Sequence, residues 1–304
     1  MLIATGPLMK PRTPLRIDAH QHFWRYRPQD YPWIGTGMDL LAQDRLPYQL
    51  QPLMEAQGLH ASIAVQARAG RDETAFLLEL ARRDRRIAGI IGWEDISSPA
   101  LAEHVERWGR HKLLGFRHQI QDEADPSAFL AQPQFNAGIA WLQERQYVYD
   151  ILVREHQLSA VRSFCAHHDR HWLVLNHLGK PALKEFRSNK GAFERWRAEL
   201  GELAAMAHVS CKISGLLTEA DWLRGLSPRD FDHILRCLDA ALEIFGPQRL
   251  MFGSDWPMCL LAASYSKVVS VVHEWARSRL SATEQDVLWG EASARIYGLS
   301  SPLH

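Results

Sequence analysis

Short apolar segments alternate with longer amphipathic segments along most of the chain. The short segments are rich in Val, Ile and Leu and end near Gly, Pro, Asn or Asp, as strands buried on both faces of a parallel sheet do. Residues 87–93 are the clearest example because they are almost wholly apolar. The pattern predicts strands at 16–23, 60–68, 87–93, 113–120, 147–154, 172–178, 208–214 and 249–255.

The segments between these strands carry apolar residues at the spacing of three and four that is typical of helices. Within 72–84, Ala75 and Leu78 are three residues apart, and so are Leu77 and Leu80. Ser281 and Glu284 form a capping box that marks the start of the last helix. Helices are expected at 47–57, 72–84, 99–110, 126–146 with a break at Pro133, 155–169, 191–207, 228–245, 264–280 and from Ser281 onward.

Eight successive strand–helix units favour an α/β fold in which a parallel sheet closes into a single-domain (β/α)8 TIM barrel. The alternative is an open doubly wound sheet, which has less support because no G-x-G-x-x-G sequence follows the first strand. We expect a loose N-terminal arm at 1–14, the barrel with its C-terminal helix at 15–299, and a tail at 300–304.

The composition narrows the possible functions. The chain has 304 residues, is 46% hydrophobic and has a formal net charge of zero, which gives no support for binding nucleic acid or an acidic membrane. No apolar run reaches the roughly 20 residues that span a bilayer, and the N-terminus lacks the features of a signal peptide. The four cysteines have no C-x-x-C spacing, so we expect reduced thiols in a cytoplasmic protein.

The first predicted strand ends in two histidines. Residues two apart on a strand face the same side, so Asp18, His20 and His22 are expected to share a side. Two neighbouring imidazoles can supply two metal ligands or two hydrogen-bond donors. The alternative is that both histidines are structural and have their hydrogen bonds satisfied within the fold. This motif alone leaves that alternative open.

Other predicted strands also end in polar side chains, and a barrel brings these ends together at one mouth. Arg117 and His118 point opposite ways in a regular strand, so one of them is expected to be structural. Asp150 either orients a site residue or belongs to a buried ion pair, and the role of Lys212 is equally open. The cluster expected at the mouth consists of His20, His22, Arg117, His118, Asp150, His177, Lys212 and Asp255.

Tryptophans occur in the loops that follow the first and the last predicted strands. Trp24 and Trp33 come after the first strand, and Trp256 comes after the last. Tryptophan usually packs in a core, but at a barrel mouth it can also stack on a sugar ring. We expect these three residues, with Asp150 and Lys212, to contact the substrate.

Six motifs at the strand ends are IDAHQHFW at 17–24, YPW at 31–33, GFRH at 115–118, NHLGKP at 176–181, KISGL at 212–216 and FGSDWP at 252–257. Together they resemble the amidohydrolase superfamily. Within it they are similar to the branch called amidohydrolase 2, which includes sugar lactonases of the L-fuconolactonase and L-rhamnonolactonase type. The resemblance covers about 16–299 and is carried by the combination of motifs, because no single motif would be specific.

The resemblance implies a barrel mouth in which His20, His22 and Asp255 hold at most one divalent metal, with Zn²⁺ expected. The two-metal pattern of the superfamily is incomplete here, since Tyr149 and Asp150 stand on the fifth strand where a histidine is usual, and no bridging lysine follows on the fourth. The branch also includes lactonases that work without a metal, so the resemblance leaves metal dependence open.

The reaction that the resemblance implies is hydrolysis of a sugar lactone, of L-fucono or L-galactono type, by attack of water on the ring ester carbonyl. Asp255 is expected to be the general base. His177, His118 and Arg117 are expected to complete the catalytic group, with positive charge or donors for the developing oxyanion.

Two other functions remain open at this point. Metal-dependent decarboxylases share the superfamily and its His-x-His and Asp motifs, but they require an anionic substrate and therefore additional arginines at the mouth. A barrel that binds a sugar without turnover is the second alternative, and the intact pair of histidines and candidate base argue against it. The expected partner is a small-molecule sugar lactone, and a homo-oligomer is left open.

Overall fold

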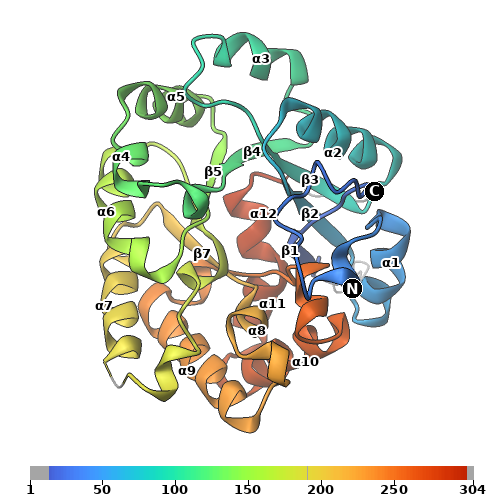
Figure 1. Cartoon of the computed structure of the whole chain (residues 1–304), viewed down its shortest axis with the longest axis vertical. Coiled ribbons are helices and arrows are strands. Elements are labelled where there is room, and N and C mark those ends of the chain that lie inside the picture. Colours follow the sequence, from blue (N-terminus) through green and yellow to red (C-terminus); the bar gives the residue numbers. More distant parts are fainter. Residues whose placement is uncertain (1–13, 190, 300–304) are drawn as a thin grey trace, which may run out of the picture.

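The computed structural model describes residues 14–189 and 191–299 of the chain. Its centre is a sheet of eight parallel strands that pair in chain order (Figure 1). A bridge between Gln21 and Trp256 joins the first strand to the loop after the last, which confirms the predicted (β/α)8 barrel. The strands are β1 (Ile17–Gln21), β2 (Ala61–Val65), β3 (Ile87–Gly92), β4 (Leu113–His118), β5 (Val148–Ile151), β6 (Leu173–Leu175), β7 (Val209–Ile213) and β8 (Leu250–Phe252).

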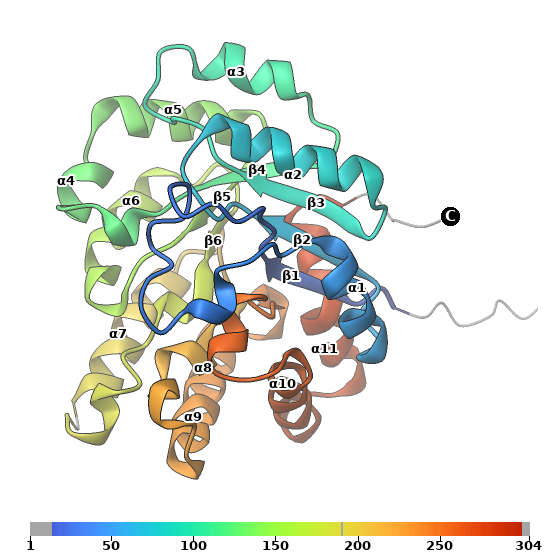
Figure 2. The same ribbon diagram turned by 45° about the vertical axis from the view of Figure 1, so that its right-hand side comes forward.

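Helices surround the strands in both views (Figure 1, Figure 2). The predicted break in the region 126–146 is confirmed, because α5 starts at Pro133, which has no N–H to donate to a preceding helical turn. The helices are α1 (Pro47–Ala56), α2 (Arg71–Arg83), α3 (Leu101–Trp108), α4 (Pro126–Leu130), α5 (Pro133–Glu144), α6 (Leu158–His167), α7 (Ala192–Ala204), α8 (Leu216–Glu219), α9 (Pro228–Phe245), α10 (Tyr265–Arg279), α11 (Ala282–Asp286) and α12 (Ala292–Ile296).

The last predicted helix begins at the Ser281 capping box, as expected, but it is not continuous. A π-helical turn over 287–291 separates α11 from α12. This turn lies against the chain that leads into β1, where a Cβ on Gly290 would come within 1.7 Å of the Leu15 carbonyl oxygen. The glycine and the wider turn therefore let the C-terminal segment pack directly on backbone.

The core has two layers of apolar side chains. The outer layer lies between the strands and the helices, and the inner layer fills the barrel with residues such as Ile63, Val148 and Met251. Ile296 and Tyr297, at the end of α12, belong to the inner cluster. Figure 1 shows α12 at the middle of the ring of strands. The C-terminal helix therefore closes one end of the barrel and leaves the other end available for a site.

The expected arm at 1–14 falls, except for residue 14, outside the described residues, and so does the expected tail at 300–304. Both therefore stay predictions. Within the described ranges, none of the helices has the length and apolar character needed to cross a membrane.

Candidate active site

Backbone hydrogen bonds tie the end of β1 to the loop after β8. The Asp255 N–H donates to the His20 carbonyl at 2.8 Å, and the His22 N–H donates to the Trp256 carbonyl at 2.7 Å. The buried Asp18 carboxylate adds to this link by accepting from the Ser254 N–H at 2.8 Å. Burial raises the pKa of Asp18 to about 6 despite these bonds. The two histidines and Asp255 are therefore held on one rigid unit.

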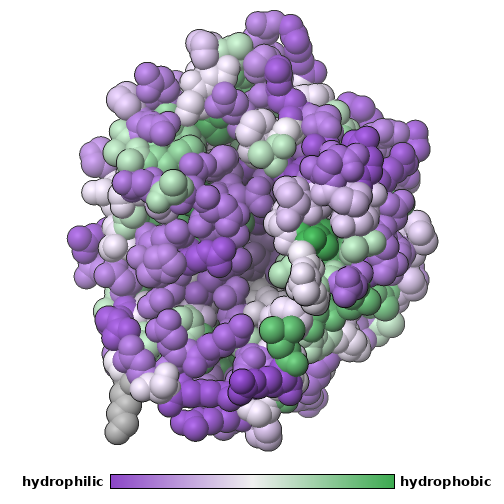
Figure 3. All heavy atoms as spheres, viewed as in Figure 1, coloured by the Kyte–Doolittle hydropathy of each residue, from purple (hydrophilic) through white to green (hydrophobic). Residues whose placement is uncertain are grey.

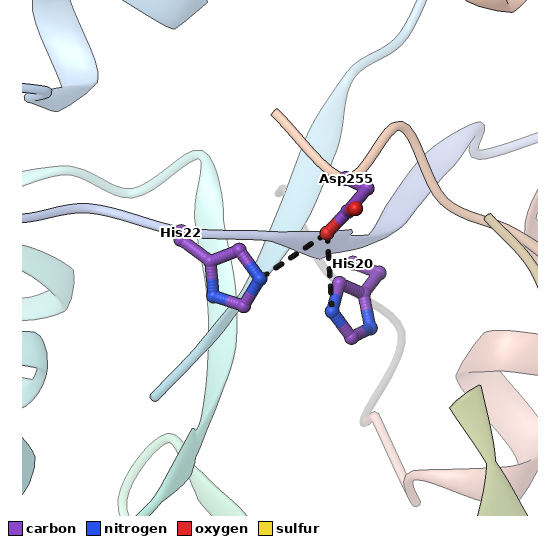
Figure 4. Close-up of side chains that lie close together, drawn as sticks. All are labelled: His20, His22 and Asp255. Atoms are coloured by element: carbon purple, nitrogen blue, oxygen red, sulfur yellow. Dashed lines mark ion pairs between the residues drawn. The ribbon is translucent and has the colours of Figure 1, made fainter. Parts of the chain in front are cut away.

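Three imidazoles surround one oxygen of Asp255. The distances from Asp255 Oδ1 are 3.3 Å to His22 Nε2, 3.7 Å to His20 Nε2 and 4.0 Å to His177 Nε2. Figure 4 shows His20 and His22 pointing their rings toward this carboxylate. The structure thus brings together four residues that the sequence places at the ends of β1, β6 and β8.

The arrangement of His22 fits a metal ligand. Its Nδ1 lies 2.8 Å from the Val65 carbonyl oxygen, which can only accept, so the ring proton is on Nδ1. The lone pair of Nε2 then faces Asp255 Oδ1, and two acceptors at this distance require a proton or a cation between them. Ligand atoms on tetrahedral Zn²⁺ lie about 3.4 Å apart. His20, His22 and Asp255 offer ligand atoms within 4.8 Å of one another, so they fit one divalent metal.

The three histidines are held in the neutral form. Burial lowers the pKa of His22, and it lowers the pKa of His177 to about 3 although Asp255 opposes this. Burial and the nearby Lys212 together lower the pKa of His20 strongly. Burial alone would raise the pKa of Asp255, but nearby positive charge, including that of Lys180, holds this pKa below its ordinary value. The site therefore combines an ionised carboxylate with neutral imidazoles.

Arg117 provides a fixed positive charge beside this group. Its guanidinium donates to Gln66 Oε1 at 2.9 Å and to Asn176 Oδ1 at 3.0 Å, and its Nη1 lies 3.3 Å from His20 Nε2. Burial lowers the pKa of Arg117 to about 10, which still leaves it charged near neutral pH. Because these bonds fix the guanidinium, Arg117 can stabilise negative charge that develops near His20 without having to move.

His118 points the other way, as the alternation along a strand requires. Its ring stacks on Phe129 with centroids 4.7 Å apart, and its Nε2 lies 2.6 Å from Glu123 Oε1. It does not line the cavity described below, whereas Arg117 does. Of the two residues that the sequence left undecided, Arg117 is the one that faces the site.

Asp150 and Lys212 form an ion pair inside the barrel, beneath the histidines. Lys212 Nζ lies 2.7 Å from Asp150 Oδ2, and both side chains are fully buried. Asp150 also accepts from Asn176 at 2.9 Å and from the Tyr297 hydroxyl at 2.7 Å. Neither residue of the pair lines the cavity, so the structure places them one layer below the position at which a substrate would lie.

A cavity of about 300 Å³ opens above the histidines and Asp255. Figure 3 shows a hollow in the middle of this face, with hydrophilic residues along one side and hydrophobic residues on the other. Trp33 lines the cavity with a partly exposed side chain, whereas Trp24 is 0% exposed and lies behind that wall. Trp256 is 1% exposed and packs against Phe23. The apolar residues at or behind the cavity wall are Trp24, Trp33, Met38, Ala67, Leu152, Trp222, Met258 and Leu261.

Several polar lining residues were not predicted from the sequence. Lys180 stands in the NHLGKP motif, but only His177 of that motif lies at the predicted strand end. Glu219 lies on α8, a four-residue helix whose apolar pattern is too short to detect. The polar residues that line the cavity without having been predicted are Gln119, Gln121, Asp122, Arg154, Lys180, Thr218 and Glu219.

Glu73, at the start of α2, supports one wall of the cavity from behind. The Ala67 N–H donates to Glu73 Oε1 at 2.7 Å, and Ala67 lines the cavity. The side chain is fully buried, and burial raises its pKa to about 7 from an ordinary value of 4.5. The loop after β2 therefore rests on a carboxyl group that is protonated more readily in the folded chain than in the unfolded chain.

We expect Glu73→Gln to change how stability depends on pH. A raised carboxyl pKa stabilises the folded state below about pH 4.5, and this contribution is lost as pH rises through about 7. Glutamine keeps the oxygen that accepts from Ala67 but does not ionise. The variant should therefore gain stability relative to the wild type between pH 5 and pH 8, on the order of 2 kcal/mol, in urea unfolding at several pH values. Glu79→Gln, at an exposed position of α2, is the control, and a pH-independent difference for Glu73→Gln would contradict the assignment.

Comparison with known proteins gives consistent matches over nearly the whole chain. The family described as amidohydrolase matches residues 17–299. An L-fucono-1,5-lactonase of Burkholderia multivorans is 65% identical over 288 residues, which cover 95% of this chain and 97% of that protein. An L-fucono-1,5-lactonase of Burkholderia ambifaria is 33% identical, over 82% of this chain and 83% of that protein.

The fold is also shared with a solved structure. A crystal structure of an amidohydrolase from Burkholderia multivorans with bound Zn has a TM-score of 0.92 and 65% sequence identity. The match covers 94% of this chain and 100% of that chain.

Proposed function

The chain belongs to the amidohydrolase family, and we propose that it is a hydrolase that opens a sugar lactone, preferentially L-fucono-1,5-lactone, to the sugar acid. The observation that carries this proposal is the position of Asp255, whose Oδ1 lies 3.3–4.0 Å from three neutral imidazoles at the cavity floor. A carboxylate in this setting can take a proton from a water molecule placed beside a bound ester.

The reaction uses Asp255 twice. Its carboxylate removes a proton from water as the water oxygen bonds to the lactone carbonyl carbon. The tetrahedral intermediate then breaks its bond to the ring oxygen, and the ring oxygen takes the proton from Asp255. The oxyanion that forms between these steps is stabilised by the fixed charge of Arg117. His177 can add a donor on Nε2 in the tautomer in which the Ser214 hydroxyl, 2.9 Å from Nδ1, donates to Nδ1.

The charges that line the cavity favour a neutral substrate. Among the described residues that line it, three are cationic and three are anionic, with the histidines neutral. The net charge of these side chains is thus close to zero, so the lining lacks the additional arginines that the anionic substrate of a decarboxylase would need besides a bound metal. These charged residues are Arg117, Arg154 and Lys180 against Asp122, Glu219 and Asp255.

The apolar side of the cavity suits the 6-deoxy group of an L-fucono lactone. Trp33 and Met38 line this side and pack against the buried Trp24 in one apolar cluster. A methyl group packed there is removed from water, which is worth about 0.8 kcal/mol for each buried carbon. An aldonolactone panel followed by acid release with a pH indicator tests the proposal. Hydrolysis of no lactone, or release of carbon dioxide from an aromatic carboxylate instead, would contradict it.

Zn²⁺ is the metal that we propose for His20, His22 and Asp255, because the set combines two imidazoles and one carboxylate. When bound, such an ion would polarise the lactone carbonyl and lower the pKa of a water molecule. A cytoplasmic location and a homo-oligomer stay predictions of the sequence.

Removing and restoring the metal gives a direct test of this site. After chelation and dialysis, adding Zn²⁺ at about 100 times its dissociation constant should stabilise the wild type by about 2.7 kcal/mol, observed as a rise in melting temperature. His22→Ala should lose most of this rise, since it removes one ligand of three. His273→Ala, which changes a histidine outside the cavity, is the control. If the wild type binds no zinc in this titration, the proposed metal site is wrong.

A further inference from the structure

The chain after β6 makes an uncommon turn that points two side chains into the cavity. His177, Leu178, Gly179 and Lys180 have φ angles of 56°, 52°, 67° and 52°, so four consecutive residues are left-handed. Left-handed backbone costs roughly 1–2 kcal/mol for each residue that is not glycine. The turn is closed by a hydrogen bond of 2.8 Å from the Lys180 N–H to the His177 carbonyl. Residues three apart in such a turn lie on one side, and both His177 and Lys180 line the cavity.

The surrounding structure holds this turn firmly. The Trp196 Nε1–H donates to the Leu178 carbonyl at 2.9 Å, and Leu178 is fully buried. Gly179 is packed against α6 so closely that a Cβ there would lie 2.7 Å from Leu158 Cδ2. Strained backbone that persists under such constraint clusters at functional sites. Since His177 alone could be presented from a regular strand end, the turn has its clearest effect on Lys180.

Glu219 is brought to the same part of the cavity by a close passage of the chain after β7. A Cβ on Gly215 would lie 2.6 Å from His177 Nδ1 and 3.2 Å from Asp255 Oδ2, so only glycine lets the chain pass here. The helix α8 follows at once and places Glu219 at the cavity wall. Figure 1 shows α8 beside the ends of the strands.

Lys180 and Glu219 face each other without a direct hydrogen bond. Lys180 Nζ lies 3.8 Å from Glu219 Oε1, which is too long for a hydrogen bond, and the side chains are 19% and 24% exposed. Burial lowers the pKa of Lys180 and raises that of Glu219, so the pair is costly as a purely structural ion pair. A hydroxyl group placed beside both could accept from the ammonium and donate to the carboxylate.

We propose that Lys180 and Glu219 form a subsite that binds one ring hydroxyl of the lactone and selects substrates that carry it. The inference rests on the proposed lactonase function and adds a specificity-determining pair to it. In this proposal the apolar wall of Trp33 and Met38 faces the methyl group, and the Lys180–Glu219 pair binds a hydroxyl. One donor and one acceptor recognise a hydroxyl better than a hydrogen or a carboxylate, because either substitute leaves one partner unsatisfied.

The test uses Lys180→Met, which keeps the length of the side chain and removes its charge, and Glu219→Gln, which keeps its shape. With L-fucono-1,5-lactone, each variant should raise KM about 10–100-fold, with a smaller change in kcat, because ground-state and transition-state binding are both weakened. Lys184→Met is the matched control, since Lys184 is exposed, follows closely in sequence and does not line the cavity. It should leave KM unchanged.

A set of lactones, each of which lacks a different ring hydroxyl, identifies the hydroxyl that the Lys180–Glu219 pair contacts. The wild type should lose about 10–100-fold in kcat/KM with one of these analogues, and Lys180→Met should lose little more with that same analogue. Unchanged KM in both variants, a loss confined to kcat, or an equal loss with every analogue would overturn the subsite. If the wild type hydrolyses no lactone, the proposed function itself fails, and that result is distinct from all of these.

Discussion

Asp255→Asn is expected to lower the turnover of L-fucono-1,5-lactone by about 10²–10⁴-fold, the range that proton transfer by a positioned side chain contributes. The amide cannot take a proton from water, although it is nearly the same size as the carboxylate. It can donate to His22 Nε2, which faces Asp255 Oδ1 at 3.3 Å with a lone pair, so the fold should be kept. Acid release followed with a pH indicator measures turnover, and the melting temperature checks the fold.

The control for this variant is Asp239→Asn on α9, where the carboxylate forms an exposed ion pair with Arg279 and does not line the cavity. It should retain full turnover. Because Asp255 is also a proposed metal ligand, the zinc content of Asp255→Asn is measured in the same preparation. Turnover within about threefold of the wild type would remove Asp255 from the mechanism.

Asp150→Ala is expected to destabilise the protein by about 3–5 kcal/mol, because breaking a buried ion pair leaves an uncompensated charge. Lys212 is fully buried and would lose its partner at 2.7 Å. Asn176 and Tyr297 would lose an acceptor at the same time. Asn176 in turn accepts from Arg117, so the loss should also loosen the cavity floor. Urea unfolding measures the change in the free energy of unfolding.

Glu243→Ala is the matched control for that measurement, since it breaks the ion pair between Glu243 and Arg197 on the outer helices. Exposed pairs of this kind contribute about 0–1 kcal/mol. A loss of less than about 1 kcal/mol for Asp150→Ala as well would show that the buried network does not stabilise the barrel.

Most of the fold could be predicted from local patterns in the sequence. Strands buried on both faces have nearly continuous apolar sequences, and helices repeat every three to four residues, so each element carries its own signal. Even the break before Pro133 is a local effect of one residue that lacks an N–H. The four-residue α8 escaped prediction because one helical turn is too short to show a period.

The closeness of four polar residues at the strand ends also followed from the sequence. In a closed parallel barrel all carboxyl ends of strands meet at one mouth, so His20, His22, His177 and Asp255 had to lie near one another once the fold was known. The resemblance to the amidohydrolases pointed to the same residues, and the family match agrees with it.

Only the tertiary structure decided how deep each side chain lies in the barrel and which side chains enter the cavity. The sequence gives the order of residues on a strand but not the level of each side chain in the barrel, so it could not show that Asp150 and Lys212 lie beneath the floor. Nor could it show that Lys180 enters the cavity, because left-handed backbone at a residue other than glycine persists only where surrounding packing imposes it. Positions of this kind depend on contacts between segments far apart in the chain, which no local pattern records.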